Sequence, residues 1–202
     1  MFDISLQELL MRVMSGLVIL ALHGYIQAWT AFRLGDSTPK EEGRVTFNPM
    51  THLSWLGFIW YVIFLKGWGK AIWLDMERFP KHSNLAWVAL AGWLGLLGLA
   101  LLAIGLHPLA LNSFSGDVGF VLVSFLGLLA LGSIWYLLWS LIPVPPLSGF
   151  ALVAVVQPKV YAAAIKYVLA FEVALLLLAA FSWIEGVLRP LYGKILRLLG
   201  GS

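Results

Sequence analysis

The sequence predicts an all-α integral membrane protein that crosses the bilayer about four times, with short re-entrant or interfacial helices between the spans. Hydrophobic residues make up 61% of the 202 positions and charged residues 11%, whereas soluble domains carry about 25% charged residues. The few charges gather in polar stretches that separate long apolar runs. We therefore expect a single membrane domain over residues 1–202, with a core at 7–184 and an amphipathic C-terminal tail at 185–202.

The same composition excludes several classes of function. The chain has no cysteine, so disulfides, thiolate metal sites and cysteine nucleophiles are ruled out. Its formal net charge is only +3, and no block of like charges suggests an arm that binds nucleic acid. The expected partners are therefore the lipid bilayer and the helices of other membrane proteins or a larger membrane complex, and not nucleic acid.

Four apolar runs are long enough to cross a bilayer, because a helix of about 20 residues spans a hydrocarbon core of roughly 30 Å. They lie between Arg12 and Arg33 and over residues 85–106, 118–142 and 161–184. A further apolar stretch at 53–65 has only thirteen residues. At about 1.5 Å per residue it reaches roughly 20 Å, so it is predicted to be re-entrant or interfacial.

The polar connection after the first span, residues 35–52, has a local pattern of its own. Apolar and polar residues alternate near 43–48, which is the period of a strand, so a short β-hairpin is predicted there. Asn48 followed by Pro49 is typical of a helix start.

A proline-rich loop follows the third span. The run Pro143-Val144-Pro145-Pro146 cannot continue a helix and is predicted to be extended. A short apolar helix should then run to about Val156, with Ser148 as its natural N-cap.

The basic residues indicate an orientation. Seven Lys and Arg residues lie between Arg33 and Lys81, and none lies in the predicted loop at 107–117. Basic loops tend to stay on the cytoplasmic side of a membrane. The expected location is a bacterial cytoplasmic (inner) membrane, with the polar loops 33–52 and 66–84 in the cytoplasm.

Polar residues also occur within the apolar runs. His23 lies about halfway along the first span, and Gln27, four residues later, lies on the same helix face. Such side chains are costly in lipid unless they face protein or a water-filled cavity, so both are predicted to point inward as a satisfied polar pair. Glu172 in the fourth span and His52 are candidates for an intramembrane polar site.

The order of motifs around His23 resembles that of the site-2 protease family of zinc intramembrane metalloproteases. That family carries His-Glu-x-x-His on its first core membrane helix, then a Leu-Gly-Asp turn, then Gly-Arg-x-Thr-x-Asn-Pro-x-x-His. The frame is kept here as His23, Leu34-Gly35-Asp36, Gly43-Arg44-Val45-Thr46-Phe47-Asn48-Pro49 and His52. The resemblance covers about residues 5 to 180 and implies a site-2-protease-like helix bundle.

The residues that bind and use zinc in that family are replaced here. Gly24 stands at the glutamate position, Gln27 at the second histidine, and Ser148 at the aspartate of the family's Leu-Asp-Gly motif. One imidazole with a carboxamide and a hydroxyl is a poor zinc site, and no general base adjoins His23. We therefore predict that these four positions form a degenerate site with no catalytic residue, no metal and no cofactor.

Three functions remain open. The leading hypothesis is a catalytically inactive relative that acts as a binding or structural module. Residues that line the family's substrate cleft are then candidates for holding a partner segment: Val45, Thr46, Phe47, Pro143, Val144 and Pro145. One alternative is an active zinc protease with rewired ligands, drawn from His52, His82, His107, Asp36 or Glu172. The other is an accessory subunit of a larger membrane assembly.

Overall fold

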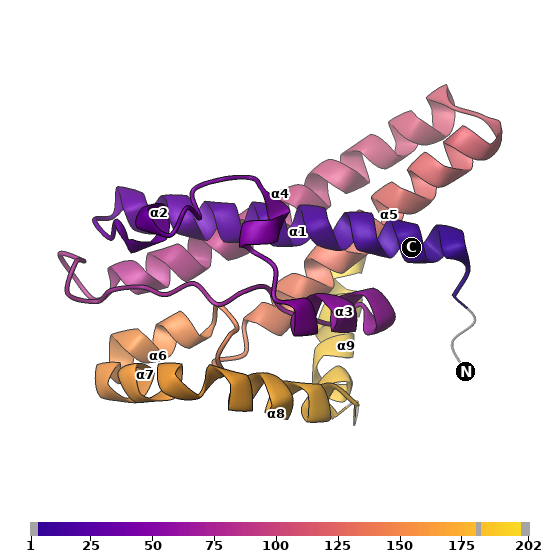
Figure 1. Ribbon diagram of the computed structural model, residues 1–202. Helices are drawn as coiled ribbons and strands as arrows, with labels where there is room; N and C mark the ends of the chain where they lie inside the picture. The colour runs from indigo at the N-terminus through magenta and orange to yellow at the C-terminus, as the bar shows by residue number, and fades with distance from the viewer. Residues whose placement is uncertain (1–3, 181–182, 199–202) are drawn as a thin grey trace.

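The computed structural model describes residues 4–180 and 183–198, which form helices and their connections (Figure 1). In chain order the elements, with η marking 3-10 helices, are α1 (Leu6–Arg33), α2 (Thr38–Glu41), η1 (Pro49–Thr51), α3 (Trp55–Phe64), α4 (Asn84–Ser113), α5 (Gly116–Ser140), α6 (Phe150–Val156), α7 (Pro158–Ala164), η2 (Ile165–Tyr167), α8 (Val168–Ala180) and α9 (Trp183–Leu198). Residues 199–202 of the predicted tail lie outside the described residues.

Within the described residues, four helical segments are long and apolar enough to cross a membrane, which fits a polytopic membrane protein. They are α1, α4, α5 and the continuous segment Pro158–Leu178 formed by α7, η2 and α8. The prediction of a short helix at 53–65 is confirmed by α3, whose ten residues are too few for a span.

The second span is longer than predicted, and the loop after it is shorter. A loop was expected at 107–117, but α4 continues through Pro108 to Ser113. Proline removes only one backbone donor from the helix, and Ala110 beyond it is still buried. The helix thus continues past the proline although Leu109 and Leu111 on either side of Ala110 are exposed.

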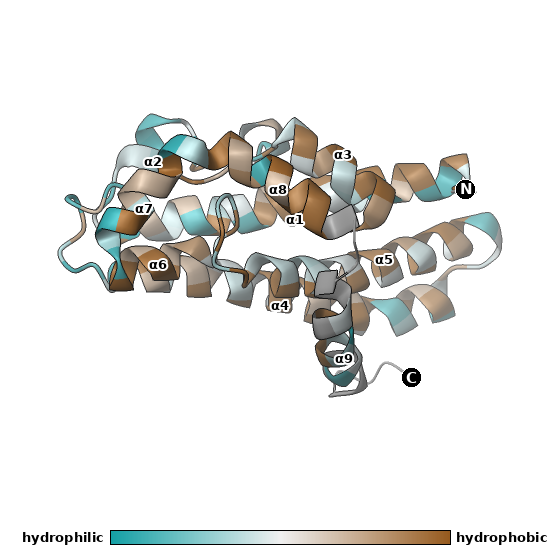
Figure 2. Ribbon diagram, turned by 90° about the horizontal axis from the view of Figure 1, so that it is seen from below, coloured by the Kyte–Doolittle hydropathy of each residue, from teal (hydrophilic) through white to brown (hydrophobic). Residues whose placement is uncertain are grey.

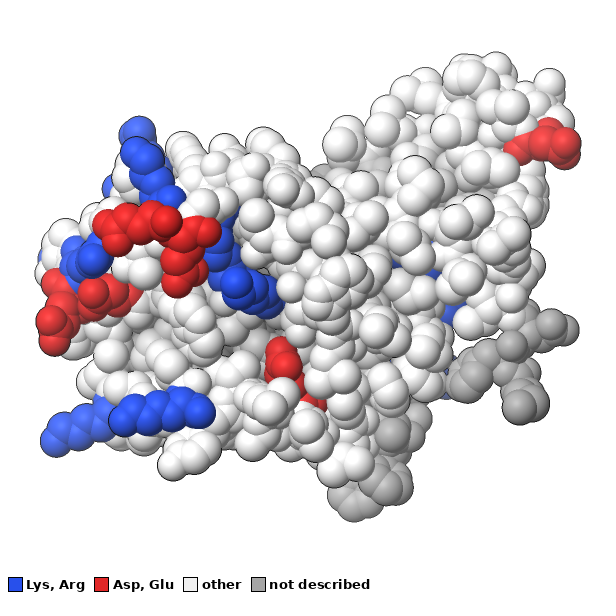
Figure 3. All heavy atoms as spheres, in the orientation of Figure 1, with Lys and Arg blue, Asp and Glu red and all other residues white. Residues whose placement is uncertain are grey.

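The polar loops collect at one end of the molecule. In Figure 1, α1 crosses the view above α3, with α6, α7 and α8 below, and the α4–α5 hairpin projects at the end opposite α2. Charged side chains gather around α2 and are sparse over the rest of this face (Figure 3). The hydropathy colouring of Figure 2 shows the same separation of hydrophilic loops from hydrophobic helices.

The start of α1 is fixed by side-chain contacts. The hydroxyl of Ser5 accepts a hydrogen bond from the backbone N–H of Glu8 at 3.2 Å, as an N-cap. Arg12 donates to the carbonyls of Val62 and Ile63 at 3.1 and 2.7 Å. These carbonyls lie in the last turn of α3, where a helix leaves its acceptors unpaired, so Arg12 holds α3 alongside α1.

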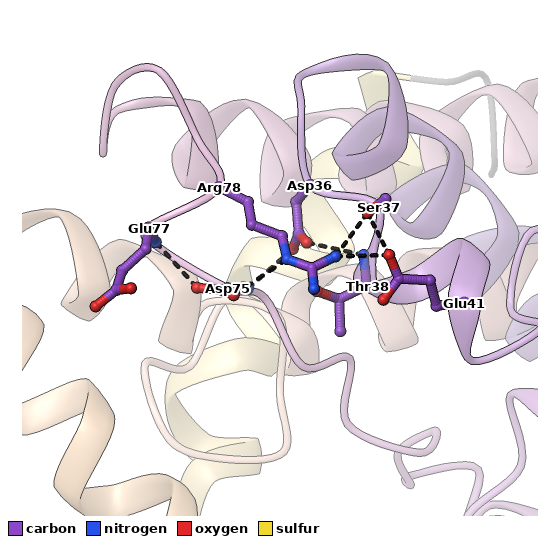
Figure 4. Close-up of polar contacts among 7 residues, drawn as sticks. All are labelled: Asp36, Ser37, Thr38, Glu41, Asp75, Glu77 and Arg78. Atoms are coloured by element: carbon purple, nitrogen blue, oxygen red, sulfur yellow. Dashed lines mark hydrogen bonds and ion pairs between the residues drawn. The ribbon is translucent and has the colours of Figure 1, made fainter.

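The loop between α3 and α4 is tied to the end of α1 by polar contacts (Figure 4). The buried carboxylate of Asp36 accepts from the backbone N–H groups of Thr38 and Asp75, each at 2.9 Å. Arg78 forms an ion pair with Glu41 at 2.7 Å. These contacts bring the loop back over α1, where it forms one wall of the candidate site.

The predicted β-hairpin at 43–48 is not confirmed, because no sheet is found in the ranges that the structure describes. Val45 and Thr46 lie in a bend instead. The carbonyl of Thr46 is 2.8 Å from Nε2 of His52, and its hydroxyl accepts from the N–H of Asn48 at 3.2 Å. Local bonds of this kind compete with strand pairing for the same polar groups.

The proline loop turns rather than running extended. The N–H of Val144 bonds the carbonyl of Ile142, and that of Leu147 bonds the carbonyl of Val144, both at 2.9 Å. Helix α6 begins only at Phe150 and has no side-chain cap. The prediction that Ser148 caps this helix is therefore wrong, because its hydroxyl is engaged elsewhere.

Candidate functional site

A small cavity lies where α1, the loop after α3, the end of α5 and the proline loop meet. Its volume is about 50 Å³, which is room for a few water-sized groups. All four predicted positions of the degenerate site line it: His23, Gly24, Gln27 and Ser148. The rest of its polar wall includes Arg44, His52, Lys70, Tyr136 and Ser140.

His23 and Ser148 face each other across this cavity. His23 is 5% exposed, and its ring meets Tyr136 edge-on with centroids 5.3 Å apart. Its Nε2 is 3.5 Å from Oγ of Ser148, which is long for a hydrogen bond. The hydroxyl of Ser148 accepts from the indole N–H of Trp93 at 3.0 Å and donates to the carbonyl of Ser140 at 3.4 Å. Ser148 is thus occupied by neighbours that leave it a poor metal ligand.

The ring of His52 occupies the space beside Gly24. A Cβ atom on residue 24 would lie 2.3 Å from Nδ1 and 2.6 Å from Cγ of His52. The ring is 1% exposed, and its Nε2 is within hydrogen-bond distance of the Thr46 carbonyl. A carbonyl only accepts, so Nε2 carries the proton and Nδ1 of the neutral ring is left as an acceptor. Burial lowers the pKa of His52, which favours this neutral form.

Gln27 and His23 lie on one face of α1 as predicted, yet no hydrogen bond joins these two described residues. Both pack against Gly92 of α4, where a Cβ atom would lie 2.9 Å from Cγ of Gln27 and from Nε2 of His23. Gln27 is 5% exposed, and it lines the cavity. The predicted pair is therefore two separate polar groups on one cavity wall.

Arg44 lines the same cavity, although it was not among the predicted site residues. It is 2% exposed and donates to the carbonyls of Ala71 and Lys70, the latter at 2.8 Å. No carboxylate in the described parts of the chain lies within ion-pair distance of it. The sequence shows an arginine in a polar connection, and only the return of the loop after α3 buries it.

Two of the proposed replacement ligands are held elsewhere. Asp36 is fixed at the end of α1 by the backbone bonds of Figure 4. Glu172 on α8 accepts from Ser54 at 3.1 Å and from the indole N–H of Trp68 at 3.0 Å, both through Oε1. Glu172 therefore joins α8 to α3 and to the loop after it, and it does not line the cavity.

The remaining histidines fall into two groups. His52 lines the cavity together with His23. His82 is exposed in the loop before α4, and His107 lies within α4; neither lines the cavity. The wall therefore carries two imidazoles.

The first set of partner-binding candidates, residues 45–47, lies next to the cavity through the contact of Thr46 with His52. Val45 and Thr46 are half-buried. Phe47 is 60% exposed and stacks on Tyr25 of α1 with ring centroids 3.9 Å apart.

The second set, in the proline loop, spans several environments. Pro143 is exposed, and Val144 is half-buried against a cluster that contains Trp68. Pro145 is buried and lines the cavity. The structure thus brings Pro145, but not the whole set, to the cavity wall.

The donors on this wall do not fit a zinc ion, which proteins hold with three or four His, Cys, Asp or Glu ligands. The wall offers two imidazoles, an amide and hydroxyl groups, and no carboxylate. Throughout residues 4–180 and 183–198, no group of three or more such side chains could hold a metal ion.

The chain is similar to a protein of Bacillus subtilis (strain 168) named "Putative zinc metalloprotease YwhC". The two are 32% identical over 152 residues, which cover 72% of this chain and 68% of that protein. No protein-family model matches the chain, and no solved structure does either.

Proposed function

The chain belongs to the site-2-protease-like family of zinc metalloproteases, and from this premise we propose that it is a catalytically inactive member that holds a segment of another membrane protein. The observation that carries the proposal is the packing of His52 on Gly24. A zinc protease needs a general base beside its metal-bound water. The His52 ring fills the space that a side chain at residue 24 would need for that role.

The chemistry of the cavity wall supports the same conclusion. Anionic and nitrogen ligands offset the cost of dehydrating a zinc ion. Here a serine held by Trp93 and a glutamine amide stand at two family ligand positions. Without those ligands the site disfavours a divalent cation.

The partner would lie against residues 45–47, next to the cavity. The exposed ring of Phe47 offers an apolar contact for an extended or helical segment. We place this binding site in a bacterial cytoplasmic membrane, with loops 33–52 and 66–84 on the cytoplasmic side, because those loops hold seven of the 13 Lys and Arg residues.

Metal analysis of the purified full chain tests the proposal. Wild type, His23→Ala and the control His82→Ala, which changes an exposed histidine away from the cavity, are purified without chelator and their zinc is measured per chain. We expect well below one zinc per chain in all three. One zinc per chain that is lost in His23→Ala and kept in His82→Ala would show that the family's metal site survives.

Partner capture tests the binding role separately. A photo-crosslinking residue at position 47 should trap membrane segments of other proteins, and one at the exposed His82 should not. Purification in mild detergent then separates two forms of the role. A fixed partner at constant ratio indicates an accessory subunit, whereas several segments trapped in small amounts indicate a binder. Equal labelling from both positions would contradict a binding site at residues 45–47.

One observation favours the alternative of an active enzyme with rewired ligands. Nδ1 of His52 is a buried acceptor without a partner among the described residues, and it lines the same cavity as His23. Two imidazoles are still fewer ligands than a catalytic zinc site uses. If the protein is such an enzyme, purified wild type contains zinc, and His52→Ala should lose it as His23→Ala does.

A further inference from the structure

The cavity that replaces the family's metal site has the opposite electrostatic character. Arg44 and Lys70 line it, and no aspartate or glutamate does. Lys70 is exposed, but Arg44 is 2% exposed and keeps its charge at any ordinary pH. A buried charge is costly unless another group compensates it. The two carbonyls that accept from Arg44 carry no net charge. The carboxylate of Glu42 attracts the guanidinium from beyond ion-pair distance and does not line the cavity.

Two nitrogens on this wall are also without hydrogen-bond partners. Nε of Arg44 and Nδ1 of His52 are both buried and unpaired within the described chain. Native proteins leave few such atoms, and each one calls for a physical explanation. Gln27 adds an amide to the same wall. The wall thus presents a positive charge and several open hydrogen-bonding positions.

We propose that this cavity binds a carboxylate. The proposal rests on the proposed function, because a metal ion held by His23 would occupy the same space. A carboxylate oxygen would accept from Nε of Arg44 and from the amide of Gln27, and it would compensate the buried charge. A volume of about 50 Å³ admits such a group with a water molecule that donates to His52.

Two sources could supply this chemistry. One is a glutamate or aspartate side chain on the membrane segment that the protein holds, since His23 lies well inside the membrane-spanning helix α1. The other is a small free carboxylate from solution. A soluble carboxylate and a membrane peptide, used as separate probes, distinguish these two sources.

The experiment uses the full chain in lipid nanodiscs, with zinc measured on the same sample. Acetate is titrated at constant ionic strength, with acetamide as an uncharged probe of the same shape, and the thermal unfolding midpoint is followed. A ligand that binds only the folded protein raises this midpoint. The membrane-borne source is probed with a 20-residue leucine–alanine peptide that carries glutamate, or glutamine as its control, at the centre.

We expect acetate, the glutamate peptide or both to bind, and their neutral counterparts not to bind. In Arg44→Gln the Kd should rise at least tenfold, whereas in Arg33→Gln, which changes an exposed arginine at the end of α1 that does not line the cavity, it should stay within twofold. If Arg44→Gln does not fold, the acetate–acetamide and glutamate–glutamine comparisons on wild type decide alone. Equal effects of charged and neutral probes on zinc-free protein would overturn the carboxylate site and leave the proposed function intact. Stoichiometric zinc would instead overturn the proposed function.

Discussion

The contact of His52 with Gly24 makes a quantitative prediction for Gly24→Ala. Alanine is favoured over glycine within a helix by about 0.5–1 kcal/mol, but the new Cβ would lie 2.3 Å from Nδ1 of His52. The buried ring must move, and overpacking of this kind costs about 1–3 kcal/mol. Gly98→Ala in α4 is a matched control, because a Cβ there meets nothing within 4 Å. The difference between the two variants isolates the overpacking.

The assay is equilibrium unfolding of the purified chain in detergent. Gly24→Ala should be less stable than Gly98→Ala by about 1–3 kcal/mol. The double variant Gly24→Ala/His52→Ala should recover most of this loss, because the two residues are in contact and their effects are not additive. Equal stability of the two single variants would mean that the His52 ring does not fill the space beside residue 24. It would contradict the proposal that this ring leaves no room for a side chain there.

Three further predictions concern other contacts. Ser148→Ala removes the acceptor of the Trp93 indole and should lower the free energy of unfolding by about 1 kcal/mol, without changing the zinc content. Glu172→Ala leaves two donors unpaired and should cost about 1–3 kcal/mol, whereas Glu172→Gln keeps an acceptor oxygen and should cost less; similar losses in both variants would contradict this role. Hydrogen bonds from Ser37 and Arg78 lower the pKa of Glu41 below 4.5, so its stabilising contribution is full above 4.5 and is lost as pH falls through the lowered value. In an NMR titration, Arg78→Gln should raise that pKa towards 4.5, and an unchanged pKa would refute the pairing.

The membrane spans could be predicted from the sequence because length and apolar composition determine them directly. Runs near 20 residues form helices long and apolar enough to cross a membrane, and the thirteen residues at 53–65 contain only a short helix. Boundaries were harder to predict, since they depend on packing beyond the run itself. Helix α4, for example, continues through Pro108 to Ser113, where a loop was predicted.

The site could be predicted only in part. Motif order brought His23, Gly24 and Ser148 to one place, and they do line one cavity. The sequence does not reveal contacts made across the fold, such as the Trp93 indole that engages Ser148. The burial of Arg44 depends likewise on a loop that returns from beyond α3. The charge of the cavity therefore became visible only in the folded chain.

The most direct test of the central claim is an experimental density map of the protein grown or incubated with zinc and measured at the zinc absorption edge. The account predicts no anomalous peak beside His23, with the His52 ring still packed on Gly24. A peak held tetrahedrally by His23 and two further side chains, with a bound water next to an acid, would contradict it.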